Sequence, residues 1–355
     1  MTTGFNTLLK TPLIALLCLF TLAQVAHGAD DDYSAEGERR AKAAGESLVG
    51  TPAPQMKMTT IDGKAIDLAD LYGKKPVYIK FWATWCVPCR EQMPSFEDIY
   101  KKYGDKVQVI AVNTGISDNI KSVTEFSKKM GLTMPITIDD GKLARAFHLR
   151  VTPQHLLIDK NGKFAYFGHR DDKEFHQALD KVVAEKATGK PLHNPTFVAK
   201  DSGYNLGDTV PDLAFSTIDE KPLNIKFNTA SSKKVAAVFF GPWCEWYLET
   251  TEPKTSQACT RVRELLEKKS QASTVQWVTV STNLWSSVAE LKDYRKSYGT
   301  TMPIVFDRDG ELFKQFGVNQ VPSISLIDAD GKVILKSSIQ DDDFDAVLHT
   351  ISALK

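Results

Sequence analysis

Three short motifs occur twice along the chain in the same order, and this repeat constrains the fold more than any other feature. The pairs are Thr60-Ile61-Asp62 and Thr217-Ile218-Asp219, Thr133-Met134-Pro135-Ile136 and Thr301-Met302-Pro303-Ile304, and Val151-Thr152-Pro153 and Gln320-Val321-Pro322. Chance agreement at so many ordered points is improbable, so the sequence predicts a duplicated domain. A chain of 355 residues is also long for one hydrophobic core and suits two domains.

Strand-like and helix-like segments alternate within each copy. In the first copy we predict strand 77–81, a helix from about residue 87, strand 107–113, an amphipathic helix around 123–130, hairpin strands 156–158 and 163–167, and a helix over 174–184. In the second copy we predict strand 235–240, a helix around 262–266, strand 275–280, a helix around 288–294 and a hairpin turn at 328–331. This order predicts an α/β fold in which each copy has a mixed central sheet flanked by helices.

The N-terminal segment has the pattern of a signal peptide. Lys10 precedes an apolar stretch from Thr11 to Val25, and small residues follow it up to Ala29. The stretch falls short of the roughly 20 apolar residues that span a bilayer. We therefore predict a signal peptide over 1–28, cleaved near Gly28, a periplasmic location and no stable membrane insertion afterwards. An uncleaved anchor is the alternative.

After the signal peptide we predict a first domain over 36–187, a linker over 188–206 and a second domain over 207–355. The linker is rich in Pro, Asn, Gly and Lys, which favour irregular structure. The 44 basic and 44 acidic residues cancel, which argues against nucleic acid as a partner.

Cys86-Val87-Pro88-Cys89 directly follows the apolar run Val77 to Trp85. A strand that turns into a helix at this point places the Cys86 sulfur at the helix N-terminus, where unpaired amides and the helix dipole favour the thiolate. We expect Cys86, the more exposed cysteine, to attack a substrate disulfide, and Cys89 to resolve the mixed disulfide. Pro88 costs little in the first turn and limits the amides that reach the Cys86 sulfur. The pattern predicts a thiol–disulfide oxidoreductase.

Two structural roles compete with this catalytic interpretation of Cys86 and Cys89. A structural zinc site needs four ligands, and no second Cys-x-x-Cys or finger-like His pair exists, so we predict no metal. A purely structural disulfide is the other alternative, and the position between strand and helix argues against it. We predict no cofactor.

The first copy resembles the TlpA/ResA-like exported thiol–disulfide oxidoreductases over roughly residues 50 to 185. The resemblance rests on Phe81 to Glu91, Pro94, Val151-Thr152-Pro153 and Ile158-Asp159. The second copy resembles the same fold with a divergent site, so the resemblance implies two tandem thioredoxin-like domains. It also implies that Pro153 follows a cis peptide bond and faces the active-site sulfurs, and that Trp85 flanks the site.

The family resemblance implies a direction of reaction and a set of partners. It points to reduction of disulfides in other exported proteins, such as partners in cytochrome maturation or copper delivery. Because that compartment is oxidising, a membrane-linked electron donor is then expected. Oxidation or isomerisation of exported thiols is the alternative.

Lys80 departs from thioredoxin, which carries a buried acid six residues before its first cysteine. The simpler expectation is that the Lys80 side chain reaches solvent. The alternative is that its charge lies beneath the site and favours the thiolate. In either case the usual acid is missing, so the sequence does not identify the group that exchanges protons with Cys89.

In the second copy the motif position holds Cys244, but Tyr247 stands where the resolving cysteine would be. An unbroken helix would separate Cys244 from Cys259 by about 22 Å, whereas a disulfide tolerates Cα separations up to about 7 Å. Pro253 allows the segment to break, and an exported chain seldom keeps two free thiols. We therefore predict a Cys244–Cys259 pair near Pro322, either redox-active or a clamp.

Two other functions stay open for the second copy. One is a thiol peroxidase activity at Cys244, which lacks the Pro-x-x-x-Thr-x-x-Cys arrangement. The other is a non-enzymatic module that docks clients through the aromatic residues Trp243, Trp246 and Tyr247.

Overall fold

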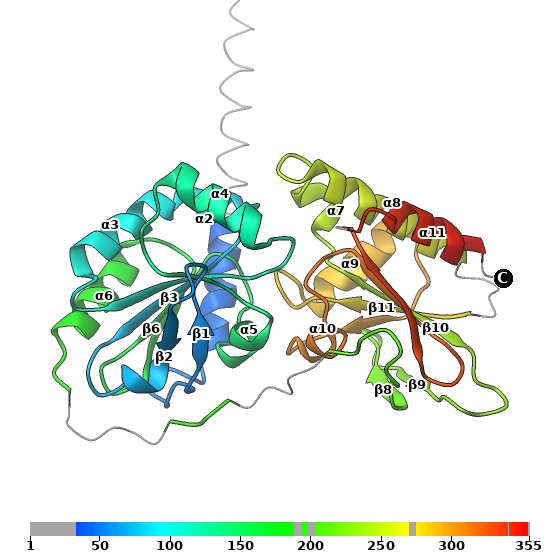
Figure 1. The fold of residues 1–355 in the computed structure, drawn as a ribbon, viewed down its shortest axis with the longest axis horizontal. Helices are drawn as coiled ribbons and strands as arrows, with labels where there is room; N and C mark the ends of the chain where they lie inside the picture. Colours follow the sequence, from blue (N-terminus) through cyan, green and yellow to red (C-terminus); the bar gives the residue numbers. More distant parts are fainter. Residues whose placement is uncertain (1–32, 188–193, 198–202, 270–274, 340, 354–355) are drawn as a thin grey trace, which may run out of the picture.

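The structure is a computed structural model that describes residues 33–187, 194–197, 203–269, 275–339 and 341–353. The predicted signal peptide and most of the predicted linker lie outside the described residues. Within the described part of the chain, no helix is long and apolar enough to cross a membrane. Figure 1 shows two α/β domains side by side, each built around its own sheet.

The first domain has a five-stranded mixed sheet. Its strands, in spatial order, are β5 (Ile136–Ile138), β4 (Gln108–Asn113), β3 (Val77–Trp82), β6 (Gln154–Ile158) and β7 (Phe164–Gly168). The first three run parallel to one another, while β6 is antiparallel to both β3 and β7. A small hairpin of β1 (Lys57–Thr59) and β2 (Ala65–Asp67) precedes the short helix η1 (Leu68–Asp70).

The second sheet has the same order of strands. They are β12 (Ile304–Phe306), β11 (Val275–Ser281), β10 (Lys234–Phe240), β13 (Ser323–Ile327) and β14 (Val333–Ser338). A hairpin of β8 (Leu213–Ser216) and β9 (Pro222–Ile225) again precedes the sheet in the chain. The predicted duplication and the two mixed sheets are thus confirmed. The short strands β5 and β12 and both small hairpins were not predicted, because three or four residues carry too little periodicity.

Helices flank both sheets (Figure 1). Those of the first domain are α2 (Val87–Glu91), α3 (Met93–Tyr103), α4 (Ile120–Met130), α5 (Lys142–Ala146) and α6 (Lys173–Ala184). Those of the second are α7 (Cys244–Tyr247), α8 (Pro253–Lys269), α9 (Val288–Tyr298), α10 (Glu311–Gln315) and α11 (Phe344–Ala353).

Helices α4 and α9 are equivalent, and the sequence sets their ends in the same way. The side chain of Asn119 caps the start of α4, and the side chain of Ser287 caps the start of α9. Gly131 and Gly299 end the two helices in the left-handed conformation, with φ of 67° and 65°. Glycine adopts this conformation without the steric cost that a Cβ atom brings.

Residues 33–45 form a helix that the sequence analysis did not predict. Glu38 of this helix accepts a hydrogen bond from the backbone N–H of His169 at 2.7 Å, which attaches it to the first domain. Arg40 reaches the second domain, where its guanidinium lies 2.6 Å from the carboxylate of Glu290. This helix therefore contacts both domains.

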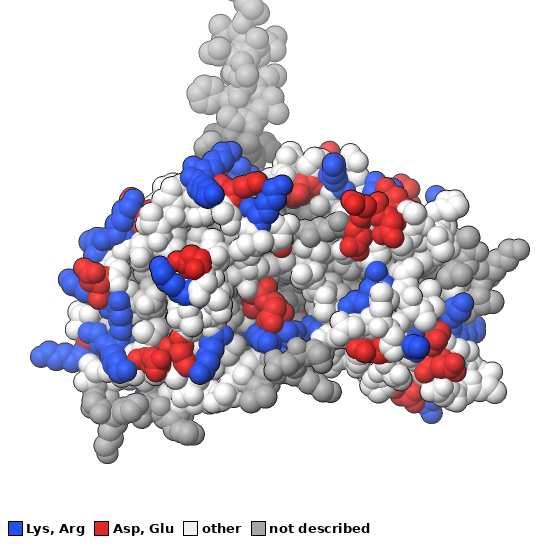
Figure 2. Space-filling model, viewed as in Figure 1, with Lys and Arg blue, Asp and Glu red and all other residues white. Residues whose placement is uncertain are grey.

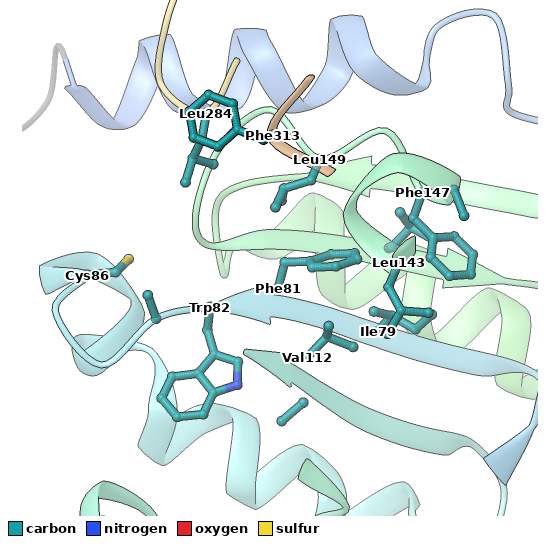
Figure 3. Close-up of a cluster of buried hydrophobic side chains, with 14 of the residues drawn as sticks. Ile79, Phe81, Trp82, Cys86, Val112, Leu143, Phe147, Leu149, Leu284 and Phe313 are labelled. Carbon is teal, nitrogen blue, oxygen red and sulfur yellow. The ribbon is translucent and has the colours of Figure 1, made fainter. Parts of the chain in front are cut away.

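A buried hydrophobic cluster continues from the first domain into the second. Figure 3 shows Leu284 and Phe313 of the second domain next to Leu149 of the first. The second domain also has two buried clusters of its own. Figure 2 shows acidic and basic side chains interspersed on the visible face, as the balanced charge predicts.

Candidate active site

Cys86 and Cys89 lie where β3 is followed by α2. Cys86 is the N-cap of α2, and its Sγ accepts a hydrogen bond from the backbone N–H of Cys89 at 3.3 Å. A disulfide joins the two residues, whose Cα atoms are 5.2 Å apart. Pro88 lies in the first turn of α2, where backbone N–H groups have no intrahelical partner. After reduction, the Cys86 sulfur is therefore placed where the helix N-terminus favours a thiolate.

Cys86 is not the exposed cysteine that the sequence predicted. Both cysteine side chains of this pair are 0% exposed. The second domain contacts the residues on both sides of Cys86: the Trp243 ring stacks on Trp85 with centroids 5.2 Å apart, and the Tyr247 hydroxyl accepts a hydrogen bond from the Val87 N–H at 3.2 Å. A pattern within one domain gives no information about a cover that another domain supplies.

A buried carboxylate that the sequence analysis missed holds the loop before Cys86. Asp118 accepts hydrogen bonds from the Thr84 backbone N–H at 2.8 Å and from the Thr84 hydroxyl at 2.5 Å. It also accepts one from the Asn113 amide at 2.8 Å. The adjacent Trp85 indole donates to the Ile116 carbonyl at 2.7 Å. Polar residues that follow the end of a buried strand were the available signal for Asp118.

Pro153 follows a cis peptide bond, as the family resemblance implies, and so does Pro322 in the second domain. The Pro153 carbonyl accepts a hydrogen bond from His169 Nδ1 at 2.8 Å. His155, two residues after Pro153, is buried and contacts the Tyr78 hydroxyl at 2.6 Å. Burial lowers the pKa of His169 and holds the pKa of His155 well below its usual range. Both histidines are therefore neutral structural groups at neutral pH.

Lys80 is buried, which overturns the expectation that its side chain reaches solvent. Its Nζ lies 3.4 Å from the Gln92 carbonyl oxygen and 5.0 Å from the centre of the Phe96 ring. All six residues of β3 are buried because both faces of the sheet are covered, so a lysine here has no path to water. Burial lowers the pKa of the Lys80 ammonium to about 7, although the Asp171 carboxylate opposes this shift.

Cys244 and Cys259 form a second disulfide, with Cα atoms 6.2 Å apart. Helix α7 ends at Tyr247 and α8 begins at Pro253, so the chain breaks between the two cysteines and turns back. Unlike Cys86, Cys244 lies inside its helix. Its N-cap is Trp243, which makes no side-chain capping hydrogen bond. The disulfide thus joins α7 to α8.

The second disulfide is buried. Cys244 is 0% exposed and Cys259 is 7% exposed. The Cys244 sulfur lies 4.0 Å from the carbonyl oxygen of Val321, the residue before Pro322, and Cys259 and Pro322 line one small cavity. All four cysteines that the structure describes are paired. Over the described ranges, no group of three or more His, Cys, Asp or Glu side chains is placed to hold a metal ion.

Comparison with known proteins supports the assignment of each domain. The AhpC/TSA family matches residues 49–167, and the Redoxin family matches residues 205–348. The thioredoxin-like protein YneN of Bacillus subtilis is 37% identical over 134 residues, which cover 37% of this chain and 78% of YneN. The thiol-disulfide oxidoreductase ResA of Bacillus thuringiensis (strain Al Hakam) is 39% identical over 139 residues, which cover 38% of this chain and 79% of ResA.

The chain belongs to the ResA-type family of thioredoxin-like thiol–disulfide oxidoreductases. Among solved structures, a putative thiol:disulfide interchange protein DsbE from Chlorobium tepidum aligns at 29% identity with a TM-score of 0.35, covering 38% of this chain and 98% of that protein.

The ResA-type likeness covers the first domain, so the oxidoreductase activity of this enzyme belongs to that domain and its Cys-x-x-Cys pair. The second domain has the Redoxin match, a different cysteine spacing and a tyrosine in place of the resolving cysteine.

Proposed function

We propose that the enzyme is exported and reduces disulfides of other exported proteins by dithiol–disulfide exchange at Cys86 and Cys89. The observation that carries this proposal is the position of Cys86 at the N-cap of α2, with Cys89 one turn away and the two Cα atoms 5.2 Å apart. A sulfur in this position is a stabilised leaving group and a thiolate near neutral pH, and its partner is close enough to displace the substrate.

The reaction has two exchange steps. The Cys86 thiolate attacks one sulfur of the substrate disulfide, forms a mixed disulfide and releases the other substrate sulfur as a thiolate. The Cys89 thiolate then attacks the Cys86 sulfur, closes the Cys86–Cys89 disulfide and releases the second substrate sulfur. The substrate gains two electrons and two protons, and the enzyme loses them. A membrane-linked dithiol donor returns the enzyme to its reduced form.

Lys80 is a buried titratable group near α2, and we assign it to proton exchange in this site. Its contact with the Gln92 carbonyl, three residues after Cys89, places the amine beneath the helix that carries both cysteines. With a pKa of about 7, the amine gains or loses a proton close to neutral pH. It thereby stands in for the acid that thioredoxin has at this position.

Mixed-disulfide trapping tests the proposed exchange. A Cys89→Ser variant incubated with an oxidised protein substrate should accumulate a covalent complex through Cys86, because the resolving thiol is gone. Cys86→Ser should form none. Mass mapping identifies the linked cysteine, and a complex formed through Cys244 or Cys259 instead would contradict the assignment.

Cell fractionation tests the proposed export. The apolar N-terminal stretch supports it, and the mature chain should be recovered from the periplasm with an N-terminus near residue 29. Recovery of the full-length chain from the cytoplasm would reject this part of the proposal. We do not propose peroxidase activity, because Cys244 is buried and bonded to Cys259.

A further inference from the structure

The two domains meet through equivalent faces. The backbone N–H of Ser117 donates to the carbonyl of Asn319 at 3.1 Å, and the backbone N–H of Trp285 donates to the carbonyl of Arg150 at 2.9 Å. Ser117 and Trp285 occupy matching positions in the two copies, and so do Arg150 and Asn319, each three residues before a cis-proline. Such reciprocal contacts are the mark of a two-fold, isologous interface.

The residue before the first cysteine of each domain lies at the centre of this interface. Trp85 and Trp243 stack with an angle of 23° between their ring planes. Each indole also donates a hydrogen bond of 2.7 Å within its own domain, Trp85 to the Ile116 carbonyl and Trp243 to the Leu284 carbonyl. Both rings are therefore held in place by their own domain before the domains meet.

Tyr247 contacts the residue directly after the reactive cysteine. Its ring packs edge-on against Trp85 with centroids 6.1 Å apart, and its hydroxyl is bonded to the N–H of Val87, the residue directly after Cys86. This N–H belongs to the first turn of α2, where the amides have no partner within the helix. The Tyr247 side chain thus fills space beside Cys86 and accepts a hydrogen bond from the Val87 N–H, which is then not available to a substrate.

Ion pairs also connect the two domains. Arg145 pairs with Glu311, and Lys314 Nζ lies 3.3 Å from the Asp140 carboxylate. Each ion pair of this kind contributes little to the stability of the contact, and its contribution decreases as the salt concentration rises. Because the second domain has two buried clusters of its own, it does not depend on the first domain for its whole core. Separation of the domains exposes part of the buried cluster that they share but leaves both sheets and these two clusters in place.

We propose that the second domain is a dissociable cap on the first, whose Trp243 and Tyr247 occupy the surface where a protein disulfide must dock. Cys86 exchanges disulfides only after the two domains separate. This inference rests on the proposed function, because it concerns access to the same cysteine. In disulfide exchange, the attacking sulfur must lie in line with the S–S bond that breaks. A substrate disulfide cannot reach the Cys86 sulfur in this way while Cys86 is 0% exposed.

Charge reversal at the edge of the interface tests the cap in the full-length chain. Glu311→Arg places two cations opposite each other, and the double variant Arg145→Glu/Glu311→Arg restores the pair in reverse. In the reduced protein, the rate of Cys86 alkylation by iodoacetamide should rise about fivefold in the single variant and return in the double variant. Asp140→Lys, which opposes Lys314, should act in the same direction. Mass mapping gives the rate for Cys86 alone.

Ionic strength gives an independent readout on the unmodified chain. Alkylation of Cys86 should be faster at 1 M salt than at 0.05 M salt, because screening weakens the ion pairs that close the domains. Equal rates for the wild-type and Glu311→Arg chains at both salt concentrations would overturn the cap. Failure of the proposed function is distinct: the variant would then alkylate faster at Cys86 and still reduce no insulin disulfides.

Discussion

The two domains share one framework but position their first cysteines differently. Cys86 stands outside its helix as an N-cap, with extended backbone angles (φ −75°, ψ 108°), whereas Cys244 lies within α7 after a helical Trp243. The partner of Cys86 is one turn away in the same helix, and the partner of Cys244 lies on a second helix. The sheet and its strand order tolerate this change, so the fold alone does not make a reactive cysteine.

Two more positions separate the reactive domain from the other. Lys80 is matched by Val238, and Asp118, which anchors the loop before Cys86, is matched by Ser286. Ser286 donates to the Leu284 carbonyl and supplies no carboxylate to a loop. The first domain thus contains buried polar groups that weaken or constrain its core around the cysteines. The second domain has replaced them with smaller or apolar residues.

The largest expected effect comes from replacing a cysteine of the first pair by serine, and the same replacement in the second pair is its control. Cys86→Ser should lower the rate of insulin disulfide reduction by about a thousandfold or more, because the attacking group is lost. The matched double variant Cys244→Ser/Cys259→Ser should keep the rate within about twofold at a temperature where it is folded. If the rate of disulfide reduction fell by a similar factor in both variants, the two pairs could not be divided into a reactive pair and a structural pair.

Lys80→Met should stabilise the enzyme at neutral pH, because it removes an amine that is costly to charge in the core. The folded pKa of about 7 lies below the ordinary value of 10.5, so the unfolded chain binds more protons between these two values and stability rises with pH across that window. Below pH 7 the penalty is complete, and the variant should gain about 5 kcal/mol there and almost nothing above pH 10.5.

Urea unfolding at several pH values measures this difference. Lys121→Met, at an exposed position on α4, is the matched control and should change the unfolding free energy little. If Lys80→Met showed the same pH dependence as the wild type, Lys80 would be charged in the fold at all these pH values.

Removal of the second disulfide tests its role as a brace between α7 and α8. Closing a loop of this length stabilises a protein by about 3 kcal/mol, so Cys244→Ser/Cys259→Ser should lower the free energy of unfolding by about that amount. The closure of a three-residue loop by Cys86 and Cys89 is worth about half as much. Denaturant titration of both double-serine variants compares the two values directly, and equal losses would contradict the assignment.

Asp118→Ser makes the first domain resemble the second at this position. Three hydrogen bonds from Thr84 and Asn113 would lose their acceptor, at a cost of about 2 kcal/mol. Turnover should fall several-fold because the loop before Cys86 is less fixed. Retained stability with unchanged turnover would show that the Trp85 indole bond to Ile116 is sufficient to hold the loop.

The smallest effect is expected at the interface. Tyr247→Phe removes the hydrogen bond to Val87 and should raise the alkylation rate of Cys86 about threefold. Tyr103→Phe also removes one tyrosine hydrogen bond, to Asp180 within the first domain, and should leave that rate unchanged. The cap would lose support if the two variants behaved alike.

Much of the fold was predictable because its signals are local. The repeat placed both sheets, and the apolar periodicity placed α4, α6 and α9 to within a few residues. Proximity of Cys244 and Cys259 was predictable too, because Pro253 and the geometric limits of a disulfide leave few other paths for the chain. These inferences need only residues that are close in sequence or a simple distance bound.

What was missed depends on contacts between distant segments. Cys86 is buried, and its neighbours Trp85 and Val87 contact Trp243 and Tyr247, about 160 residues later in the chain. No local pattern reports contacts at such a separation. Lys80 is buried because both faces of its strand are covered. A single lysine in an apolar run does not indicate that both faces are covered. The helix over 33–45 has partners on both domains, and its own sequence is too polar to predict them.

An equilibrium redox titration with mass mapping of all four cysteines tests the central claim most directly. The account predicts that Cys86–Cys89 opens at a less reducing potential than Cys244–Cys259. We expect this order because the helix N-terminus stabilises the Cys86 thiolate and so favours the reduced form of the first pair. If Cys244–Cys259 opened first, or if both pairs opened together, the reactive centre would not be confined to the first domain.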